Sequence, residues 1–282
     1  MEIIKTALEM KKYAGNLRSN GNSIGFVPTM GYLHEGHLSL IERAHKENDR
    51  TIVSIFVNPT QFSAQEDLST YPRDLERDFA LIKNYTDAVF VPESAEIYPQ
   101  NFSTFVEVEC LTDNLCGKFR PGHFRGVATV VAKLFNIVRP DRAYFGKKDY
   151  QQFRVIERMA RDLNFDVKVI PCEIIREPSG LAMSSRNVYL SQQEKEDAAI
   201  IHKALVLGRE MIENGTRDSA SVICGIQELL KSKTSLKKID YVSVVNPFTL
   251  QDVDSIKSDV VILVAAYFGK ARLIDNIEVR SI

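Results

Sequence analysis

The clearest fold signal in the chain lies in residues 24–37, Ile-Gly-Phe-Val-Pro-Thr-Met-Gly-Tyr-Leu-His-Glu-Gly-His. The apolar start of this stretch predicts a buried strand over residues 24–28 that runs into a loop. The apolar residues Leu38, Ile41 and Ala44 recur at helical spacing and predict a helix over residues 37–48. Strand, loop and helix in this order are the start of an α/β unit.

The same alternation continues through the first two-thirds of the chain. Further strands are predicted at 51–57, 88–91, 143–145 and 167–171, helices at 72–85, 127–138 and 150–164, and a short exposed strand at 104–109. Apolar strands that alternate with helices are typical of a parallel sheet covered on both faces. Ligands bind such sheets at the carboxyl ends of the strands, so we expect the site in the loops after Val27, Val57 and Phe145.

The last third of the chain has a different pattern. Ser191 and Glu194 form a capping box that predicts a helix running to about Glu213, where Asn214-Gly215 ends it. A second helix is predicted at 219–231, followed by strands at 239–245, 260–268 and 271–279. We therefore expect an α/β protein of two domains, residues 1–187 and a smaller α+β domain of residues 188–282.

Composition excludes several classes of protein. The 282 residues are 44% hydrophobic and 26% charged, which is typical of a globular protein rather than a disordered or fibrous one. The longest apolar run, residues 260–268, is too short to span a membrane, and the N-terminus does not resemble a signal peptide. The four cysteines form no C-x-x-C pair, so we expect buried thiols in a reducing, cytoplasmic compartment.

The net charge of −1 argues against a nucleic-acid partner, but the charge is unevenly distributed. Residues 117–158 contain ten Lys or Arg and three acidic residues, a local charge of +7. Such a block suits a small polyanion such as a nucleotide. It would equally suit a solvated helix face, and charge alone leaves both readings open.

The residues between the first strand and helix suit phosphate chemistry. His34 and His37 are three residues apart and would share a face on a first helical turn, with Gly36 between them allowing close approach of a ligand. The N-terminus of a helix adds unpaired N–H groups and partial positive charge. The alternative is a tight loop in which both histidines have structural partners.

Three further segments carry polar residues at predicted loops. Asn58 and Gln61 follow a strand, and their amides suit a substrate with hydroxyls and a carboxylate, although an Asx turn would also explain Asn58. Lys148 near a helix start suits phosphate oxygens, whereas its neighbour Asp149 would suit an N-cap. Arg186, in a serine-rich loop that follows Gly180, could hold two phosphate oxygens or lie in a simple linker.

Two other groups of polar residues are less informative. The segment Arg120-Pro-Gly-His-Phe-Arg-Gly126 lies in the basic block and would either approach the phosphates or form a surface loop. His45 and His202 fall within predicted helices, and we interpret both as structural.

The residues quoted above resemble a known family. His34-Glu-Gly-His37 is similar to the HxGH signature of the nucleotidyltransferase superfamily, and the longer run 26–37 resembles the pantothenate synthetases. Residues 54–62, 145–152 and 180–187 match the same family in order and spacing. The resemblance implies a Rossmann-like nucleotidyltransferase domain that binds ATP and pantoate, with a C-terminal lid domain. It implies that pantoate is joined to β-alanine with ATP, through pantoyl adenylate, releasing AMP and pyrophosphate.

The resemblance also implies roles for individual residues. It assigns catalysis to His34, His37, Lys148 and Arg186. It assigns ATP to Met30, Gly31, Tyr32, Leu33, His34, Glu35, Gly36, His37, Gly146, Lys147, Lys148, Asp149, Ile175, Met183, Ser184, Ser185 and Arg186. It assigns pantoate and β-alanine to Asn58, Gln61 and Gln152. Lys147 departs from the family, which most often has an acidic residue there.

The resemblance implies that Mg²⁺ bridges phosphate oxygens, while the protein ligands of the ion, if any, stay unassigned. It also implies a homodimer formed through the N-terminal domain. Neither nucleic acid nor a membrane is an expected partner. Three other functions are alternatives. An adenylyltransferase that leaves AMP on its product would share the HxGH site but not residues 58–62 and 146–152. A nucleotide-sensing protein without chemistry would not need His34, His37 and Lys148. A tRNA synthetase is disfavoured because few residues follow Arg186 to bind RNA.

Overall fold

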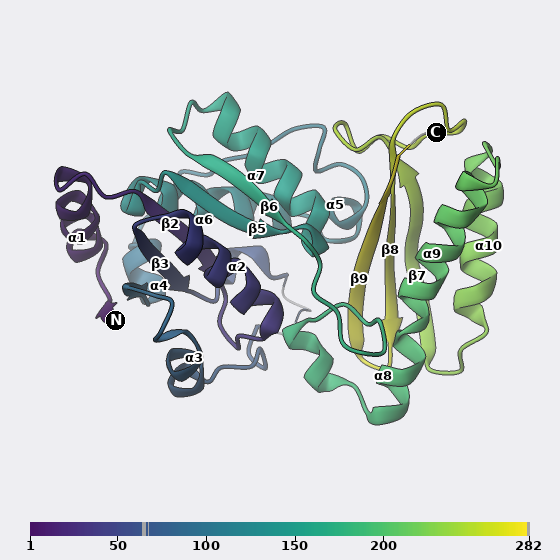
Figure 1. Cartoon of the computed structure of the whole chain (residues 1–282), viewed down its shortest axis with the longest axis horizontal. Helices are drawn as coiled ribbons and strands as arrows, with labels where there is room; N and C mark the ends of the chain where they lie inside the picture. The colour runs from purple at the N-terminus through teal and green to yellow at the C-terminus, as the bar shows by residue number, and fades with distance from the viewer. Residues whose placement is uncertain (64–65, 67, 281–282) are drawn as a thin grey trace. The chain divides into compact units, whose positions relative to one another are not determined.

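The computed structural model describes residues 1–63, 66 and 68–280, which form two compact units (Figure 1). The first unit contains residues 1–109, 120–147 and 152–173. The second contains residues 110–119, 148–151 and the chain from residue 174 onward. Two short segments that precede residue 174 therefore belong to the second unit, and each unit is described by itself below.

The first unit is a parallel sheet with helices. Its strands are β1 (Glu2–Ile4), β2 (Ile24–Thr29), β3 (Arg50–Ile55), β4 (Ala88–Phe90), β5 (Arg142–Gly146) and β6 (Lys168–Cys172). Its helices are α1 (Ala7–Ser19), α2 (Glu35–Glu47), α3 (Leu75–Ile82), α4 (Ser94–Ile97), α6 (His123–Val138) and α7 (Tyr150–Asp162), with a 3₁₀ turn η1 (Pro59–Gln61). A second 3₁₀ turn, η2 (Lys147–Asp149), joins β5 to α7.

Side chains of the sheet alternate between two hydrophobic cores. Phe26 and Ile52 point into a core with α1, α6 and α7, whereas Val27 and Val53 point into a core with α2 and α3. Successive side chains of a strand point to opposite faces, so strands that are apolar throughout require helices on both faces. The predicted α/β architecture is confirmed by this arrangement.

Strand order places a topological switch at β2. The order is β1-β4-β3-β2-β5-β6, and every neighbouring pair is parallel. The chain moves outward from β2 to β3 and β4, then returns to the other side of β2 with β5 and β6. The carboxyl ends of β2 and β5 therefore flank the crevice in which ligands bind to open α/β sheets.

The second unit combines an antiparallel sheet with helices. Its elements are α5 (Cys116–Phe119), η3 (Ser185–Tyr189), α8 (Gln192–Ala198), α9 (Ile200–Glu213), α10 (Ser219–Lys231), β7 (Leu236–Val245), β8 (Val260–Phe268) and β9 (Ala271–Val279). The strands pair in the order β7-β8-β9. Helices α9 and α10 pack side by side, and their apolar residues share a core with the strands (Figure 1).

Several elements differ from the sequence predictions. Residues 104–109 form no strand. The amide of Val106 donates to Thr129 Oγ1 (2.9 Å), and the guanidinium of Arg125 lies 4.0 Å from the centre of the Phe105 ring. The alternating exposure of this segment therefore comes from its packing on α6. The helix predicted from Ser191 to Glu213 is interrupted at Ala199 and forms α8 and α9. The strand β1 and helix α1 had not been predicted.

The cysteines also differ from the prediction. Cys116 and Cys172 are buried, but Cys110 and Cys224 are exposed, and all four are free thiols. Cys110 has a φ of 67° in a loop, and Cys224 lies on the outer face of α10, so neither position faces a core. Within the described residues, no helix combines the length and apolar character that crossing a membrane requires.

Candidate active site at the carboxyl edge of the parallel sheet

The loop after β2 turns sharply before α2. Gly31 has a φ of +80° and Tyr32 a φ of +50°, both in the left-handed region. A Cβ at Gly31 would lie 2.9 Å from Cγ2 of Ile55, so glycine is required by space as well as by conformation. The turn brings the chain back over the end of β2 and directs the N-terminus of α2 toward the carboxyl edge of the sheet.

A buried carboxylate in α3 holds this loop. The amides of Tyr32 and Leu33 donate to Oδ2 and Oδ1 of Asp78, each at 2.7 Å, and the Asp78 residue is 0% exposed. Burial raises the pKa of the Asp78 carboxyl, while the two amide hydrogen bonds oppose that shift. Asp78 was not among the predicted site residues, because its burial becomes visible only once α3 is packed in the fold.

Both histidines of the loop act as caps of α2. His34 is the N-cap residue and its Nδ1 accepts from the amide of Gly36 (3.2 Å), while Nδ1 of His37 accepts from the amide of His34 (3.3 Å). Their ring centroids lie 4.0 Å apart, with the ring planes tilted by 37°. A ring nitrogen that accepts carries no proton, so in the neutral imidazoles the proton lies on Nε2 of each. The helix consequently begins at Glu35, two residues before the predicted start.

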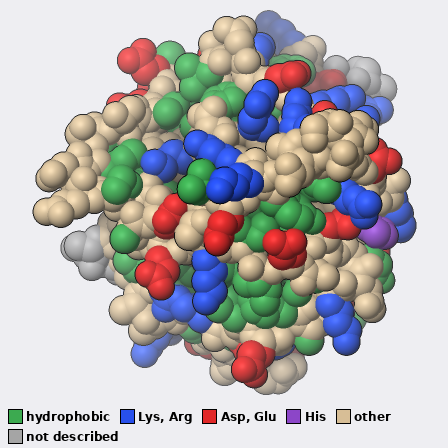
Figure 2. Space-filling view, turned by 90° about the vertical axis from the view of Figure 1, so that its left-hand side faces the viewer, with side chains coloured by type: hydrophobic (Ala, Val, Ile, Leu, Met, Phe, Trp, Pro, Cys, Tyr) green, Lys and Arg blue, Asp and Glu red, His purple; other side chains and the backbone are tan. Residues whose placement is uncertain are grey.

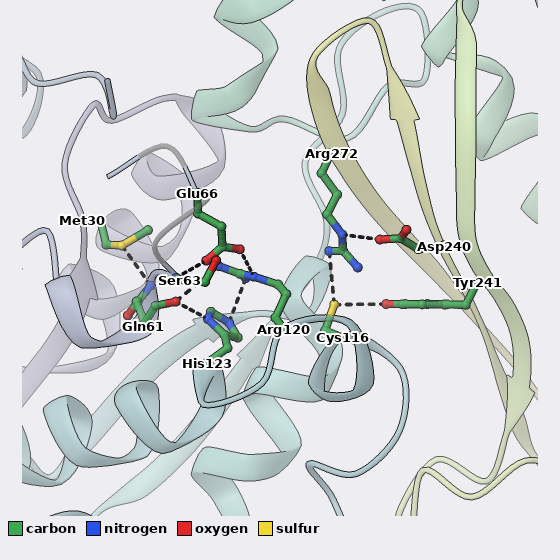
Figure 3. A network of polar contacts seen from close by, with 10 residues as sticks. All are labelled: Met30, Gln61, Ser63, Glu66, Cys116, Arg120, His123, Asp240, Tyr241 and Arg272. Carbon is green, nitrogen blue, oxygen red and sulfur yellow. Dashed lines mark hydrogen bonds and ion pairs between the residues drawn. The ribbon is translucent and has the colours of Figure 1, made fainter. Parts of the chain in front are cut away.

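The second segment follows β3 and is tied to the first. Nε2 of Gln61 donates to Sδ of Met30 (3.1 Å), and Oε1 of Gln61 accepts from Nδ2 of Asn58 (3.1 Å). Asn58 is 1% exposed, and its Oδ1 accepts from Thr60 Oγ1 (2.9 Å) and from the Tyr98 hydroxyl (2.8 Å). Figure 3 shows Met30 and Gln61 pointing toward one another. The structure therefore brings the HxGH loop and the Asn58–Gln61 segment together.

Many cations of the basic block have acidic partners. Arg120 pairs with Glu66, Lys147 with Glu173 (2.8 Å) and Arg154 with Glu157 (2.7 Å). Where Figure 2 shows the surface, Lys and Arg side chains alternate with Asp and Glu. Glu66 and Glu173 lie outside residues 117–158 and offset part of the local excess, whereas Glu157 belongs to the block itself.

The loop after β5 spans the two units. Gly146 ends β5 and has open space around its α-carbon, and the Lys147–Glu173 pair lies in the first unit. Lys148 and Asp149 belong to the second unit, where their side chains form an ion pair of 3.6 Å. The carbonyl of Lys148 accepts from Nδ2 of Asn276 in β9 (3.1 Å). Gln152, in α7 of the first unit, is half-buried.

The remaining predicted ATP residues form a compact turn in the second unit. The amide of Met183 donates to the carbonyl of Ile175 (3.0 Å), and Gly180 turns the chain between them with a φ of +93°. Ser184 caps η3, its Oγ accepting from the amide of Arg186 (3.3 Å). Ser185 is buried and Arg186 is half-buried. The serine-rich segment therefore has a defined local fold.

A protein-made metal cage is not evident. Among residues 1–63, 66 and 68–280, no group of three or more His, Cys, Asp or Glu side chains could hold a metal ion. Asp78, the buried carboxylate nearest to the HxGH loop in the fold, is already committed to two amides.

Comparison with known proteins gives consistent matches. A family model described as pantoate-beta-alanine ligase matches residues 2–278. A pantothenate synthetase of Thermotoga petrophila is 55% identical over 279 residues, covering 98% of this chain and 99% of the relative. A pantothenate synthetase of Thermotoga neapolitana is 56% identical over 277 residues, covering 98% and 99% respectively.

Solved structures agree. The pantothenate synthetase of Thermus thermophilus superposes with a TM-score of 0.94 at 46% identity, covering 99% of this chain and 100% of that chain. A pantoate-beta-alanine ligase of Francisella tularensis, solved in complex with beta-gamma ATP and beta-alanine, has a TM-score of 0.80 at 36% identity, covering 98% and 97%.

Proposed function

The chain belongs to the pantoate–β-alanine ligase family, and from this membership we propose how its residues divide the work of the reaction. The activity is that of a pantothenate synthetase, which condenses pantoate with β-alanine at the expense of ATP. The Francisella tularensis relative was crystallised with an ATP analogue and β-alanine, which supports sites for both in this chain.

We propose that the reaction takes two steps. A carboxylate oxygen of pantoate attacks the α-phosphorus of ATP, and the bond between the α-phosphorus and the bridging oxygen breaks to release pyrophosphate. The amine of β-alanine then attacks the carbonyl carbon of pantoyl adenylate, AMP leaves with the carboxylate oxygen, and the nitrogen loses a proton. A carboxylate is already a nucleophile, so the first step needs charge stabilisation and positioning more than a base.

The single observation that carries the proposal is the arrangement at the N-terminus of α2. The rings of His34 and His37 are in contact there, and backbone amides that donate to their Nδ1 atoms assign the proton of each neutral ring to Nε2. Two Nε2–H donors beside a helix N-terminus suit the negative charge that develops on the pentavalent phosphorus. Asp78 keeps the loop in place through the amides of Tyr32 and Leu33.

The amide of Gln61 is proposed to bind pantoate. It lies beside Met30 of the HxGH loop, which supports placing the nucleophile next to the ATP phosphates. The polar atoms of Asn58 are engaged by Gln61, Thr60, Tyr98 and the carbonyl of Gly126. We therefore propose that Asn58 mainly orients Gln61, whereas its contact with β-alanine and that of Gln152 with pantoate stay predictions.

Lys148 and the serine-rich segment 184–186 are proposed to bind the phosphate oxygens of ATP. Lys148 offers a compact positive charge, and Arg186 offers a planar guanidinium that can hold two oxygens. The hydroxyls of Ser184 and Ser185 lie in the same segment as Arg186, which supports a shared ligand. The other predicted ATP residues, Gly146, Lys147, Asp149, Ile175 and Met183, keep the roles that the resemblance implies.

Mg²⁺ is proposed to enter with ATP. Because the described residues offer no carboxylate cage, the ion would bind phosphate oxygens and water, as Mg²⁺ commonly does with nucleotides. A cytoplasmic location and a homodimer formed through the first unit are likewise proposals that rest on family resemblance. The homodimer is tested by analytical ultracentrifugation. The sedimentation coefficient is measured over about a hundredfold range of protein concentration, which corresponds to roughly 2.7 kcal/mol in binding free energy.

Transfer of label tests the proposed first step. Pantoate carrying ¹⁸O in its carboxylate is incubated with ATP, Mg²⁺ and β-alanine, and the AMP produced is analysed by mass spectrometry. Attack on the α-phosphorus predicts one ¹⁸O in the phosphate of each AMP. Unlabelled AMP, or formation of ADP, would contradict the adenylate route.

A further inference from the structure

The segment Arg120–Gly126 packs directly on the turn that carries Gln61. A Cβ at Gly126 would lie 2.4 Å from the carbonyl oxygen of Thr60 and 2.7 Å from the nitrogen of Gln61, so only glycine allows this contact between backbones. The carbonyl of Gly126 also accepts from Nδ2 of Asn58 (3.1 Å). The first turn of α6 is therefore a support for η1.

His123 contacts the backbone of Gln61 from this support. It is 8% exposed, its Nδ1 lies 2.8 Å from the carbonyl oxygen of Gln61, and its Nε2 lies 3.0 Å from Nη1 of Arg120 (Figure 3). A guanidinium can only donate, so Nε2 of His123 must accept. The proton of the neutral ring is then on Nδ1, which donates to Gln61.

Arg120 is itself held in place. Its Nε donates to Glu66, and Nη2 lies 3.4 Å from the carbonyl oxygen of Gln61. Burial of Glu66 opposes its ionisation, but the hydrogen bonds from Arg120 and the Ser63 amide lower the pKa of its carboxyl overall. A fixed guanidinium beside Nε2 thus selects one tautomer of His123.

We propose that His123 is a positioning residue for the pantoate subsite, in which its Nδ1–H holds the Gln61 carbonyl and so fixes the direction of the Gln61 side chain. This inference rests on the proposed role of Gln61. The carbonyl is held chiefly by His123 (2.8 Å) and more weakly by Arg120 (3.4 Å), while the side chain is held by Asn58 and Met30. Loss of the first bond would let the peptide rotate and would move the amide away from pantoate.

Two nearly isosteric substitutions separate this role from simple packing. His123→Asn keeps an N–H donor near the position of Nδ1, whereas His123→Leu has a similar shape and no donor. In His123→Leu the Gln61 carbonyl would keep only the longer contact with Nη2 of Arg120 (3.4 Å). We expect this variant to raise the KM for pantoate roughly five- to fiftyfold, the range for the loss of a buried hydrogen bond, with the KM for ATP within about threefold. His123→Asn should stay within about threefold of wild type for both substrates.

A double-mutant cycle tests whether His123 acts through Gln61. Once Gln61→Ala has removed the amide, adding His123→Leu should change the KM for pantoate by less than about twofold. Three results would each overturn the inference. In the first, the two substitutions multiply their effects on the KM for pantoate in the double variant. In the others, His123→Asn and His123→Leu lose equal activity, or the KM values for pantoate and ATP rise equally. If Gln61→Ala alone leaves pantoate use unchanged, the assignment of Gln61 itself is wrong, which separates the two proposals.

A measurement on the wild-type protein remains decisive if the variants fold poorly. Nitrogen-15 NMR of histidine-labelled protein distinguishes protonated from bare ring nitrogens, and substitution of the other four histidines in turn leaves the resonance of His123 identified. We expect Nδ1 of His123 to be protonated and Nε2 bare at neutral pH. The opposite tautomer would overturn the inference.

Discussion

Nε2 of Gln61 lies 3.1 Å from Sδ of Met30, which joins two segments that are 31 residues apart in the sequence. Met30 follows β2, and Gln61 lies in the turn after β3. Because the two strands are parallel neighbours, their carboxyl ends meet at one edge of the sheet. Strand order therefore accounts for the proposed proximity of pantoate, bound at Gln61, to the HxGH loop that binds the phosphates of ATP.

Substitution of Gln61 tests its assignment to pantoate. We expect Gln61→Ala to raise the KM for pantoate about five- to 150-fold, corresponding to the roughly 1–3 kcal/mol of an unpaired polar group. Gln61→Glu keeps the shape but places a carboxylate against that of pantoate, so it should be worse still. Separate calorimetric titrations with pantoate and with an ATP analogue measure both effects. Equal weakening of both ligands would show that Gln61 only shapes the site.

Asp78 is predicted to link stability and adenylation. Asp78→Asn replaces one acceptor oxygen by an NH₂ donor that faces a backbone amide. The free energy of unfolding should therefore fall by about 1–3 kcal/mol. Because Tyr32 and Leu33 precede His34, the rate of pyrophosphate release should also fall about tenfold or more. Asp74→Asn on the same helix is the control, since asparagine also caps helices well. A destabilised Asp78→Asn enzyme with the wild-type rate would limit Asp78 to the fold.

The HxGH loop and every described strand except β1 could be predicted from sequence because their signals are local. An apolar run such as residues 51–57 predicts a buried strand whatever surrounds it. The turn at Gly31 and the histidines that follow it were visible for the same reason. The parallel sheet followed from the alternation of strands and helices.

Asp78 could not be assigned from sequence because its partners are distant. The amide of Leu33 lies 45 residues away along the chain, and nothing local distinguishes Asp78 from the neighbouring Glu76. Residues 104–109 were mispredicted for a related reason. Their alternation reflects packing on α6, and a strand would have required a neighbouring strand that the fold does not supply. The helix start was missed because histidine is an unusual N-cap.

The segment from Met183 to Arg186 is predicted to bind the triphosphate. Arg186→Lys should slow adenylation roughly tenfold, because an ammonium cannot reproduce two parallel hydrogen bonds of a guanidinium. Transfer from supplied pantoyl adenylate to β-alanine should be nearly unaffected, since no pyrophosphate is then present. ATP with Mg²⁺ should also slow hydrogen exchange of amides 180–187. If hydrogen exchange of these amides does not change with ATP, and Arg186→Lys adenylates pantoate at the wild-type rate, the segment is only a linker.

His202 is predicted to make the protein less stable in mild acid. Burial lowers the pKa of His202 below its usual 6.5, as does the nearby charge of Arg176, and its buried Nδ1 has no hydrogen-bond partner among the described residues. The unfolded chain therefore binds this proton more readily than the folded one, so stability is lost as the pH falls below 6.5. Urea unfolding of wild type and His202→Leu between about pH 5.5 and 7.5, one unit either side of the usual histidine pKa, should show a shallower loss of stability in the variant. Parallel curves would contradict this.

Release of pyrophosphate by His37→Ala tests most directly whether the N-terminus of α2 carries the chemistry. Measured at saturating ATP, Mg²⁺ and pantoate, the rate should fall by about 10²–10³, the usual effect of losing one preorganised donor. The melting temperature should fall by only about 2–4 °C, the cost of one lost capping hydrogen bond of roughly 1 kcal/mol. His45→Ala, on the same helix but packed against Tyr85 (5.9 Å between ring centroids), should keep a rate near wild type. A His37→Ala rate within about threefold of wild type would contradict the catalytic role of this site.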